Sequence, residues 1–279
     1  MSGVFAAITT PHVPTLARAE ITPDFQRTLV DAERRLGQTL RAARPDLWVI
    51  ASTHWVSTFN WLATCQSVHQ GICVADEAPE LIPGVPYRYR GDPEYAGALV
   101  EAWSAADIPA VRNDSPHYAW DYGTYVPLSH LDPKAEVAVV SVPTVLMSNL
   151  EEARRAGAAI HDTARRLERR AVFVASTALS HALVRGRHHM PTFERIALDQ
   201  RFIELLTAGK IADLLDWLPQ FSREAAAEMG GRVLATMLGC LEAMQQDGGK
   251  LACEMIGDYA QSSGSGNATL CATAAGSGA

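Results

Sequence analysis

Short apolar segments alternate along this chain with longer segments in which apolar residues recur every three or four positions. The short segments predict buried strands, and the longer ones predict helices. The predicted strands are Val4–Ile8, Leu47–Ser52, Val137–Val142, Ala171–Ser176 and Ala268–Ala272, with further candidates at Asn60–Ala63 and Leu251–Tyr259. The predicted helices are Thr22–Ala43, Pro93–Ala106, Asn149–Arg170, Thr192–Ala208, Ile211–Trp217 and Ser222–Met244. This alternation is typical of a layered α/β fold. We therefore expect one domain over residues 1–279, with a central mixed sheet and helices packed on both of its faces.

Two long segments lack either period. Residues Gln70–Asp92 are rich in proline and glycine, and residues Asn113–Pro133 are dense in aromatic side chains and histidine. Long irregular segments inside a compact domain usually act as lids, binding loops or contact segments. We expect both segments to be irregular, and the first is a candidate for a subunit contact.

Composition narrows the class of protein. Of the 279 residues, 48% are hydrophobic, which is enough for a sizeable core. The net charge of −7 disfavours nucleic acid as a partner, because phosphate binding requires a basic surface. No apolar run approaches the roughly 18 residues that span a bilayer, and the N-terminus lacks the pattern of a signal peptide. The five cysteines show no CxxC spacing and predict reduced thiols. We therefore expect a cytoplasmic protein that binds neither nucleic acid nor membrane.

Three of the predicted strands lead into a histidine through the same kind of sequence. VFAAITTPH ends on His12, LWVIASTH ends on His54, and AVFVASTALSH ends on His181. Each is an apolar strand followed by small hydroxyl residues and then the histidine. The carboxyl ends of parallel strands lie on one side of a sheet, where ligand crevices form. If these strands are neighbours, the three histidines form one site.

Histidine nitrogen is a ligand that suits iron, zinc, copper and nickel. Two histidines and one carboxylate on one face of Fe(II) leave positions open, which is the arrangement that oxygenases use. Zinc more often keeps three protein ligands and one water for hydrolysis. The spacing of the histidines does not decide between these metals.

Five stretches of this chain resemble the class III extradiol ring-cleavage dioxygenases, the superfamily of the protocatechuate 4,5-dioxygenase catalytic subunit. They are TTPHVP, ASTHW, WDYGTYVPL, STALSH and the tail SSGSGNA. The resemblance implies a non-haem Fe(II) enzyme that inserts O2 into an aromatic ring. The substrate would be small and carry adjacent OH/OH or OH/NH2 donors, as in catechols, 2-aminophenols or hydroxypyridines.

The resemblance also implies roles for individual residues. His12 and His54 match the two histidine ligands of the family, and His181 matches its acid–base catalyst. The third ligand of the family is a glutamate on a late helix. Here Glu228 is the choice, and Glu224, one helical turn earlier, is the alternative.

One position departs from the pattern of many members. Where they carry Asp-His-Gly, this chain has Asp121-Tyr122-Gly123, which is similar to the catalytic subunit of 2-aminophenol 1,6-dioxygenases. We expect Tyr122 to donate a hydrogen bond to the bound substrate or to oxygen. The further candidates for substrate contact are His117, Asp121, Trp55 and Tyr125.

Two other functions remain open at this point. One is a zinc metallohydrolase on the same scaffold. The other is a non-catalytic partner subunit, because aminophenol dioxygenases of this family pair a catalytic chain with a degenerate relative. Retention of both histidines and a glutamate favours catalysis. We expect a homo-oligomer, or a hetero-oligomer with a related chain.

Overall fold

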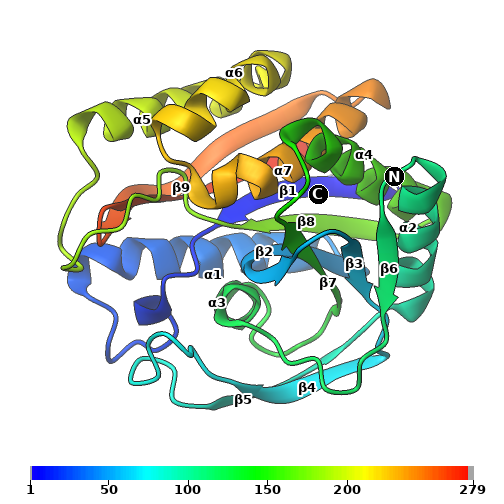
Figure 1. Cartoon of the computed structure of the whole chain (residues 1–279), viewed down its shortest axis with the longest axis horizontal. Helices are drawn as coiled ribbons and strands as arrows, with labels where there is room; N and C mark the ends of the chain where they lie inside the picture. Colours follow the sequence, from blue (N-terminus) through cyan, green and yellow to red (C-terminus); the bar gives the residue numbers. More distant parts are fainter. Residues whose placement is uncertain (1, 276–279) are drawn as a thin grey trace.

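A computed structural model describes residues 2–275, so the two ends of the predicted domain over residues 1–279 lie outside the described part. Its centre is a mixed six-stranded sheet (Figure 1). In spatial order, the strands are β7 (Ala138–Val145), β2 (Leu47–Ser57), β8 (Arg170–Ser176), β1 (Gly3–Thr10), β10 (Ser265–Ala274) and β9 (Leu251–Ser262). Strands β7, β2, β8 and β1 run parallel, whereas β10 and β9 continue the sheet in antiparallel pairing. The predicted mixed sheet is confirmed.

Helices cover both faces of this sheet because successive side chains of its central strands point to opposite sides. Phe173 packs into one core cluster, whereas its neighbours Val172 and Val174 pack into the other. The Phe173 face is covered by α2 (Pro93–Ala105), α4 (Leu150–Arg166), α5 (Phe193–Thr207), α6 (Ile211–Glu224) and α7 (Arg232–Gln246). The opposite face is covered by α1 (Arg27–Ala42) and α3 (Tyr122–Leu131), which Figure 1 shows on the other side of the sheet from α4 and α7. Among the described residues, none of the helices is long and apolar enough to cross a membrane.

The expectation that Gln70–Asp92 is irregular is wrong. The two ends of this segment form an antiparallel pair, β4 (Val68–Cys73) with β5 (Val85–Arg90), and the connection 74–84 between them is irregular. In β5, buried Tyr87 and Tyr89 alternate with exposed residues, which is a period of two. Prolines and glycines around the pair obscure this short pattern in the sequence. A second small sheet joins β3 (Trp61–Thr64) to β6 (Ala110–Asn113).

The expectation that Asn113–Pro133 is irregular is also wrong, because it contains α3. Asp121 caps this helix by accepting hydrogen bonds from the backbone N–H and the hydroxyl of Thr124, at 3.0 and 2.9 Å. Pro127 lies inside the helix and has no N–H to donate to the carbonyl of Gly123, four residues earlier. Proline and glycine so close together conceal the helix in the sequence. Figure 1 shows α3 between the central sheet and the β4–β5 pair.

The predicted helix Ser222–Met244 is interrupted. Helix α6 continues to Glu224, a short 3-10 turn follows at Glu228–Gly231, and α7 begins at Arg232. Ala226, Met229, Gly230 and Gly231 have positive φ angles of 52, 47, 65 and 76°, which no right-handed helix contains. Glu228 therefore lies on a short 3-10 turn and not on an α-helix.

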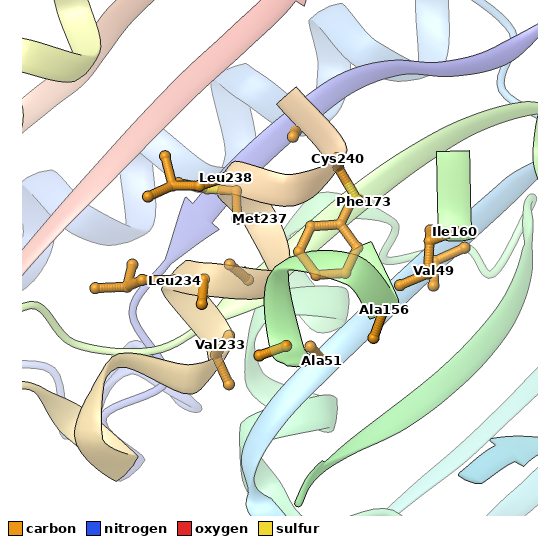
Figure 2. Close-up of a cluster of buried hydrophobic side chains, with 14 of the residues drawn as sticks. Val49, Ala51, Ala156, Ile160, Phe173, Val233, Leu234, Met237, Leu238 and Cys240 are labelled. Atoms are coloured by element: carbon orange, nitrogen blue, oxygen red, sulfur yellow. The ribbon is translucent and has the colours of Figure 1, made fainter. Parts of the chain in front are cut away.

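Helices α4 and α7 approach each other so closely that each needs a glycine at the crossing. A Cβ atom added at Gly157 of α4 would lie 1.9 Å from the carbonyl oxygen of Thr236, and one added at Gly239 of α7 would lie 1.9 Å from that of Arg154. Both obstacles are backbone atoms, so they cannot move aside as a side chain does. Figure 2 shows the side chains packed around this crossing, including Ala156 and Ile160 of α4, Leu234 and Met237 of α7, and Phe173 of β8.

The crossing predicts the effect of one substitution. Gly239→Ala should lower the free energy of unfolding by about 1–3 kcal/mol, because the added methyl group forces the two helices apart. Gly97→Ala in α2 is the matched control, since its Cβ atom would meet only the mobile guanidinium of Arg112. That control should be neutral or gain up to about 1 kcal/mol from the better helix propensity of alanine. Urea unfolding midpoints measure both, and equal effects of the two substitutions would contradict this account.

Candidate metal centre

The three histidines lie at one edge of the sheet, on three strands that are neighbours in the order β2, β8, β1. Their Nε2 atoms all face the Oε1 atom of Glu228, at 3.4 Å for His12, 3.9 Å for His54 and 3.5 Å for His181. His12 follows the end of β1 and His181 follows the end of β8, whereas His54 lies inside β2. The parallel strands thus bring the three imidazoles to a single carboxylate oxygen.

A bulge in β2 turns His54 toward this point. The pairing of β2 with β7 shifts register between Ser52 and Val56, so the residues between them leave the regular ladder. The Ser52 hydroxyl accepts a hydrogen bond from the backbone N–H of His54 at 3.1 Å and donates one to Asp121 at 2.5 Å. Ser52 therefore links the bulge that carries His54 to the cap of α3.

The ring orientation of His12 is fixed by a hydrogen bond to Nδ1, the ring nitrogen that does not face Glu228. Its Nδ1 atom lies 3.0 Å from the hydroxyl of Ser176, which itself donates to the carbonyl of Gly123 at 2.5 Å. That carbonyl is free to accept because Pro127 has no N–H to donate to it. Since the Ser176 hydrogen is already used, Nδ1 of His12 carries the proton and donates to the serine oxygen. The Nε2 atom then faces Oε1 of Glu228 at 3.4 Å.

The carboxylate of Glu228 is only 4% exposed and hydrogen-bonded through both oxygens. Oε1 accepts from the hydroxyl of Thr53 at 2.9 Å, and Oε2 accepts from the backbone N–H of Ala178 at 2.6 Å and from the hydroxyl of Thr177 at 3.2 Å. Burial by itself raises the pKa of Glu228. The charges of His12 and His181 and the Ala178 hydrogen bond outweigh burial and hold that pKa well below its usual range. Glu228 is therefore an anion at neutral pH.

The backbone holds Glu228 and His181 in one small ladder. The N–H of His181 donates to Ala226, and the N–H of Glu228 donates to Leu179, at 3.0 and 3.3 Å. On the other side, the N–H of Leu179 donates to the carbonyl of Gly266 in β10, and the N–H of Gly266 donates to the carbonyl of Ser180, both at 2.9 Å. A Cβ atom at Gly266 would lie 2.0 Å from a carboxylate oxygen of Asp199, so only glycine fits there. The SSGSGNA tail thus supports the segment that carries His181.

A buried acid lies behind this segment and was missed in the sequence. Asp199 of α5 accepts hydrogen bonds from the hydroxyls of Ser180 and Tyr259, both at 2.6 Å. Burial raises the pKa of Asp199 to about 6, and the two hydroxyl hydrogen bonds oppose that rise. It sits on a helix with an ordinary amphipathic pattern, so no local feature of the sequence distinguishes it.

Tyr122 packs on His54, with ring centroids 4.0 Å apart. Its hydroxyl donates to Oε1 of Glu77 at 2.8 Å, and the same oxygen lies 3.4 Å from Nδ1 of His54. Burial and the neighbouring Glu77 raise the pKa of Tyr122 well above its usual range. Burial, followed by the charge of His12, lowers the pKa of His54 to about 4, so His54 is neutral near pH 7 and free to act as a ligand. Glu77 belongs to no motif noted in the sequence.

A cavity of about 610 Å³ opens beside His54 and Tyr122. Of the four candidates for substrate contact, Trp55, His117 and Asp121 line it, whereas Tyr125 does not and packs against the α1–α3 face of the core. Trp55 packs against Tyr118 with the rings tilted by 46° and their centroids 4.6 Å apart. The carboxylate of Asp121 is already committed to Ser52 and to the cap of α3.

The donor set fits a metal ion. The ligand atoms of His12, His54 and Glu228 all lie within 4.8 Å of one another, and they comprise two imidazole nitrogens and one oxygen of a buried carboxylate. Glu224, the alternative, is exposed at the end of α6 and accepts a hydrogen bond from Gln220. The interruption between α6 and α7 separates the two glutamates, so they do not share one helix face as the sequence suggested.

Comparison with known proteins agrees with this geometry. Residues 6–268 match the family model described as the catalytic LigB subunit of aromatic ring-opening dioxygenase. The chain is 21% identical over 247 residues to 3,4-dihydroxyphenylacetate 2,3-dioxygenase of Escherichia coli, covering 85% of this chain and 90% of that protein. It is 26% identical over 290 residues to the 2-aminophenol 1,6-dioxygenase beta subunit of a Pseudomonas species, covering 96% and 93%.

Among solved structures, an uncharacterized protein of Escherichia coli K12 has the same fold, with a TM-score of 0.69 at 16% identity. The superposition covers 96% of this chain and 99% of that one. The family match spans nearly the whole chain, and the resemblance noted in the sequence is confirmed. The chain belongs to the family of catalytic LigB subunits of aromatic ring-opening dioxygenases.

Proposed function

We propose that this chain is a non-haem Fe(II)-dependent dioxygenase that opens small aromatic rings bearing adjacent OH/OH or OH/NH2 donors. The observation that carries the proposal is the buried Glu228 carboxylate, with the imidazole nitrogens of His12 and His54 beside it. Two relatives support the substrate class, since their names describe cleavage of a dihydroxyphenyl ring and of 2-aminophenol. Oligomerisation with a related chain and a cytoplasmic location are parts of the same proposal.

His12, His54 and Glu228 would hold the metal through Nε2, Nε2 and Oε1, the atoms that face one another. When bound, Fe(II) supplies the redox chemistry and open coordination positions with which oxygenases act. The protein supplies the rest: the hydroxyls of Thr53, Thr177 and Ser176 fix the ligands from behind. Such outer hydrogen bonds orient metal ligands and raise their basicity.

His181 is the proposed acid–base catalyst. Its Nε2 atom lies 3.5 Å from Oε1 of Glu228, and its side chain is 29% exposed, so it reaches both the site and solvent. Imidazole titrates near neutrality, which suits removal of a proton from a ring hydroxyl and its later return. For Tyr122, which was expected to donate a hydrogen bond to substrate or oxygen, the proposed role is that of an acceptor. Its hydroxyl hydrogen is donated to Glu77, so toward substrate the oxygen acts as an acceptor.

Oxygen uptake tests the proposed function directly. Protein purified without oxygen and loaded with Fe(II) should consume one O2 per ring opened when given catechol, 2-aminophenol, protocatechuate or a hydroxypyridone. Loading with Zn(II) should abolish uptake. Full activity of the zinc form without oxygen consumption would instead establish a metallohydrolase.

The assignment of Glu228 and not Glu224 as the third ligand predicts that substitutions at these two positions affect metal binding differently. Glu228→Ala should abolish stoichiometric metal binding, as should His12→Ala, because each removes one of three ligands. Glu224→Ala is the matched control, since this glutamate is exposed and its side chain bonds only to Gln220 among the contacts described. It should keep one equivalent of Fe(II), measured by metal analysis after desalting. Metal loss in the Glu224 variant with retention in the Glu228 variant would reverse the assignment.

Substitution of His181 should lower turnover without changing metal binding. His181→Ala should keep one equivalent of metal yet lower kcat by about 100- to 10,000-fold, which is the usual contribution of general acid–base catalysis. His188→Ala provides a control, because its ring packs on Phe25, with centroids 4.9 Å apart, and no metal-facing contact is described for it. Near-normal turnover of the His181 variant would place the base elsewhere.

A further inference from the structure

Glu77 lies on the connection 74–84 between β4 and β5, outside every motif that carries the family resemblance. Its side chain is 56% exposed, and it lines the cavity beside the metal centre. Despite this exposure, its Oε1 atom meets two partly or fully buried groups at once, the Tyr122 hydroxyl at 2.8 Å and Nδ1 of His54 at 3.4 Å. An exposed carboxylate is free to extend into solvent, so the inward direction of Glu77 indicates that these two contacts hold it.

The two nitrogens of His54 face different carboxylates. Nε2 faces Glu228 at 3.9 Å, and Nδ1 faces Glu77 at 3.4 Å. A neutral imidazole has one N–H donor and one lone-pair acceptor, and the group beside one nitrogen decides which is which. A carboxylate beside Nδ1 keeps the proton there and leaves the lone pair on Nε2, where the metal would bind.

His12 shows the same arrangement with a different partner. Its Nδ1 atom lies 3.0 Å from Ser176, which is fully buried in the sheet. His12 and His54 therefore each have an acceptor beside Nδ1. For His12 that acceptor belongs to the rigid core, whereas for His54 it belongs to an exposed connection.

We propose that Glu77 is a positioning residue that holds His54 in its metal-binding tautomer and, through Tyr122, fastens the β4–β5 connection to the metal centre. This inference rests on the proposed function, because it requires that His54 binds a metal. Glu77 contacts neither substrate nor the reacting atoms in this role. Metal binding and the attachment of the β4–β5 connection to the metal centre are then coupled, because the same carboxylate oxygen takes part in both.

Metal titration without substrate tests the first half of the proposal. Apoprotein is titrated with Zn(II) against a chromophoric chelator, for the wild type and for Glu77→Ala, Glu77→Gln and Glu80→Ala. Glu77→Ala should weaken Zn(II) binding by about 10- to 100-fold, the usual effect of removing an outer partner of a ligand histidine. Glu77→Gln should recover most of that loss, because its amide oxygen still accepts from Nδ1. Glu80→Ala removes the same charge from the same connection and should stay within about threefold of the wild type.

Hydrogen exchange tests the second half. Adding Zn(II) to the wild type should slow amide exchange in residues 74–84, and the slowing should be largely lost in Glu77→Ala and in Tyr122→Phe. The Co(II) absorption spectrum of Glu77→Ala should also change, because His54 is no longer held in one orientation. A merely structural role for Glu77 would alter neither observable.

The outcomes separate this inference from the function on which it rests. If the wild type binds no metal, both fail. If the wild type binds one equivalent but Glu77→Ala binds equally tightly, only the role of Glu77 is overturned. Equal weakening by Glu77→Ala and Glu80→Ala would also overturn it, because the effect would then be one of net charge.

Discussion

The carboxylate of Glu228 is the constraint on which the rest of the site depends. Burying an anion costs several kcal/mol unless charges and hydrogen bonds compensate it. Here the compensation comes from Thr53, Thr177 and the N–H of Ala178, with three imidazoles around Oε1. Each of these groups stands just after or within a strand of the parallel part of the sheet. The carboxylate thus constrains the residues at the carboxyl ends of β2, β8 and β1, because these residues must contact it.

This arrangement requires strained backbone conformations on both sides of Glu228. Ala226 and Met229 are non-glycine residues with φ near +50°, and such conformations persist only where the surroundings determine them. The surroundings here are the ladder formed with Leu179 and His181, which is itself held by Gly266 of β10. Residues from the first strand to the last therefore converge on one turn. The family match likewise spans residues 6–268.

The sequence predicts the scaffold of this site better than its fine structure. Long apolar strands and amphipathic helices have strong periodicity, so the central sheet and its layers could be predicted, as could the approach of His12, His54 and His181. Helix α3 could not, because Gly123 and Pro127 contradict a helix locally, while the Asp121 cap and tertiary packing stabilise it. The break before Glu228 was missed because the alanines before it favour helix, and only Gly230 and Gly231 indicate a turn. Ser176, Asp199 and Glu77 act through contacts over long sequence separations, and local patterns carry no information about such contacts.

The two ligand histidines differ in what supports them, and this difference has a consequence for function. His12 is backed by Ser176 and by a carbonyl that Pro127 leaves free, all within the buried core. Changes there would disturb the sheet itself. His54 is backed from the cavity side, where Tyr122 and Glu77 of the connection 74–84 line the cavity. The support of His12 therefore belongs to the core of the fold, whereas that of His54 belongs to the wall of the cavity, where a change of side chain would act on the metal centre and on the cavity together.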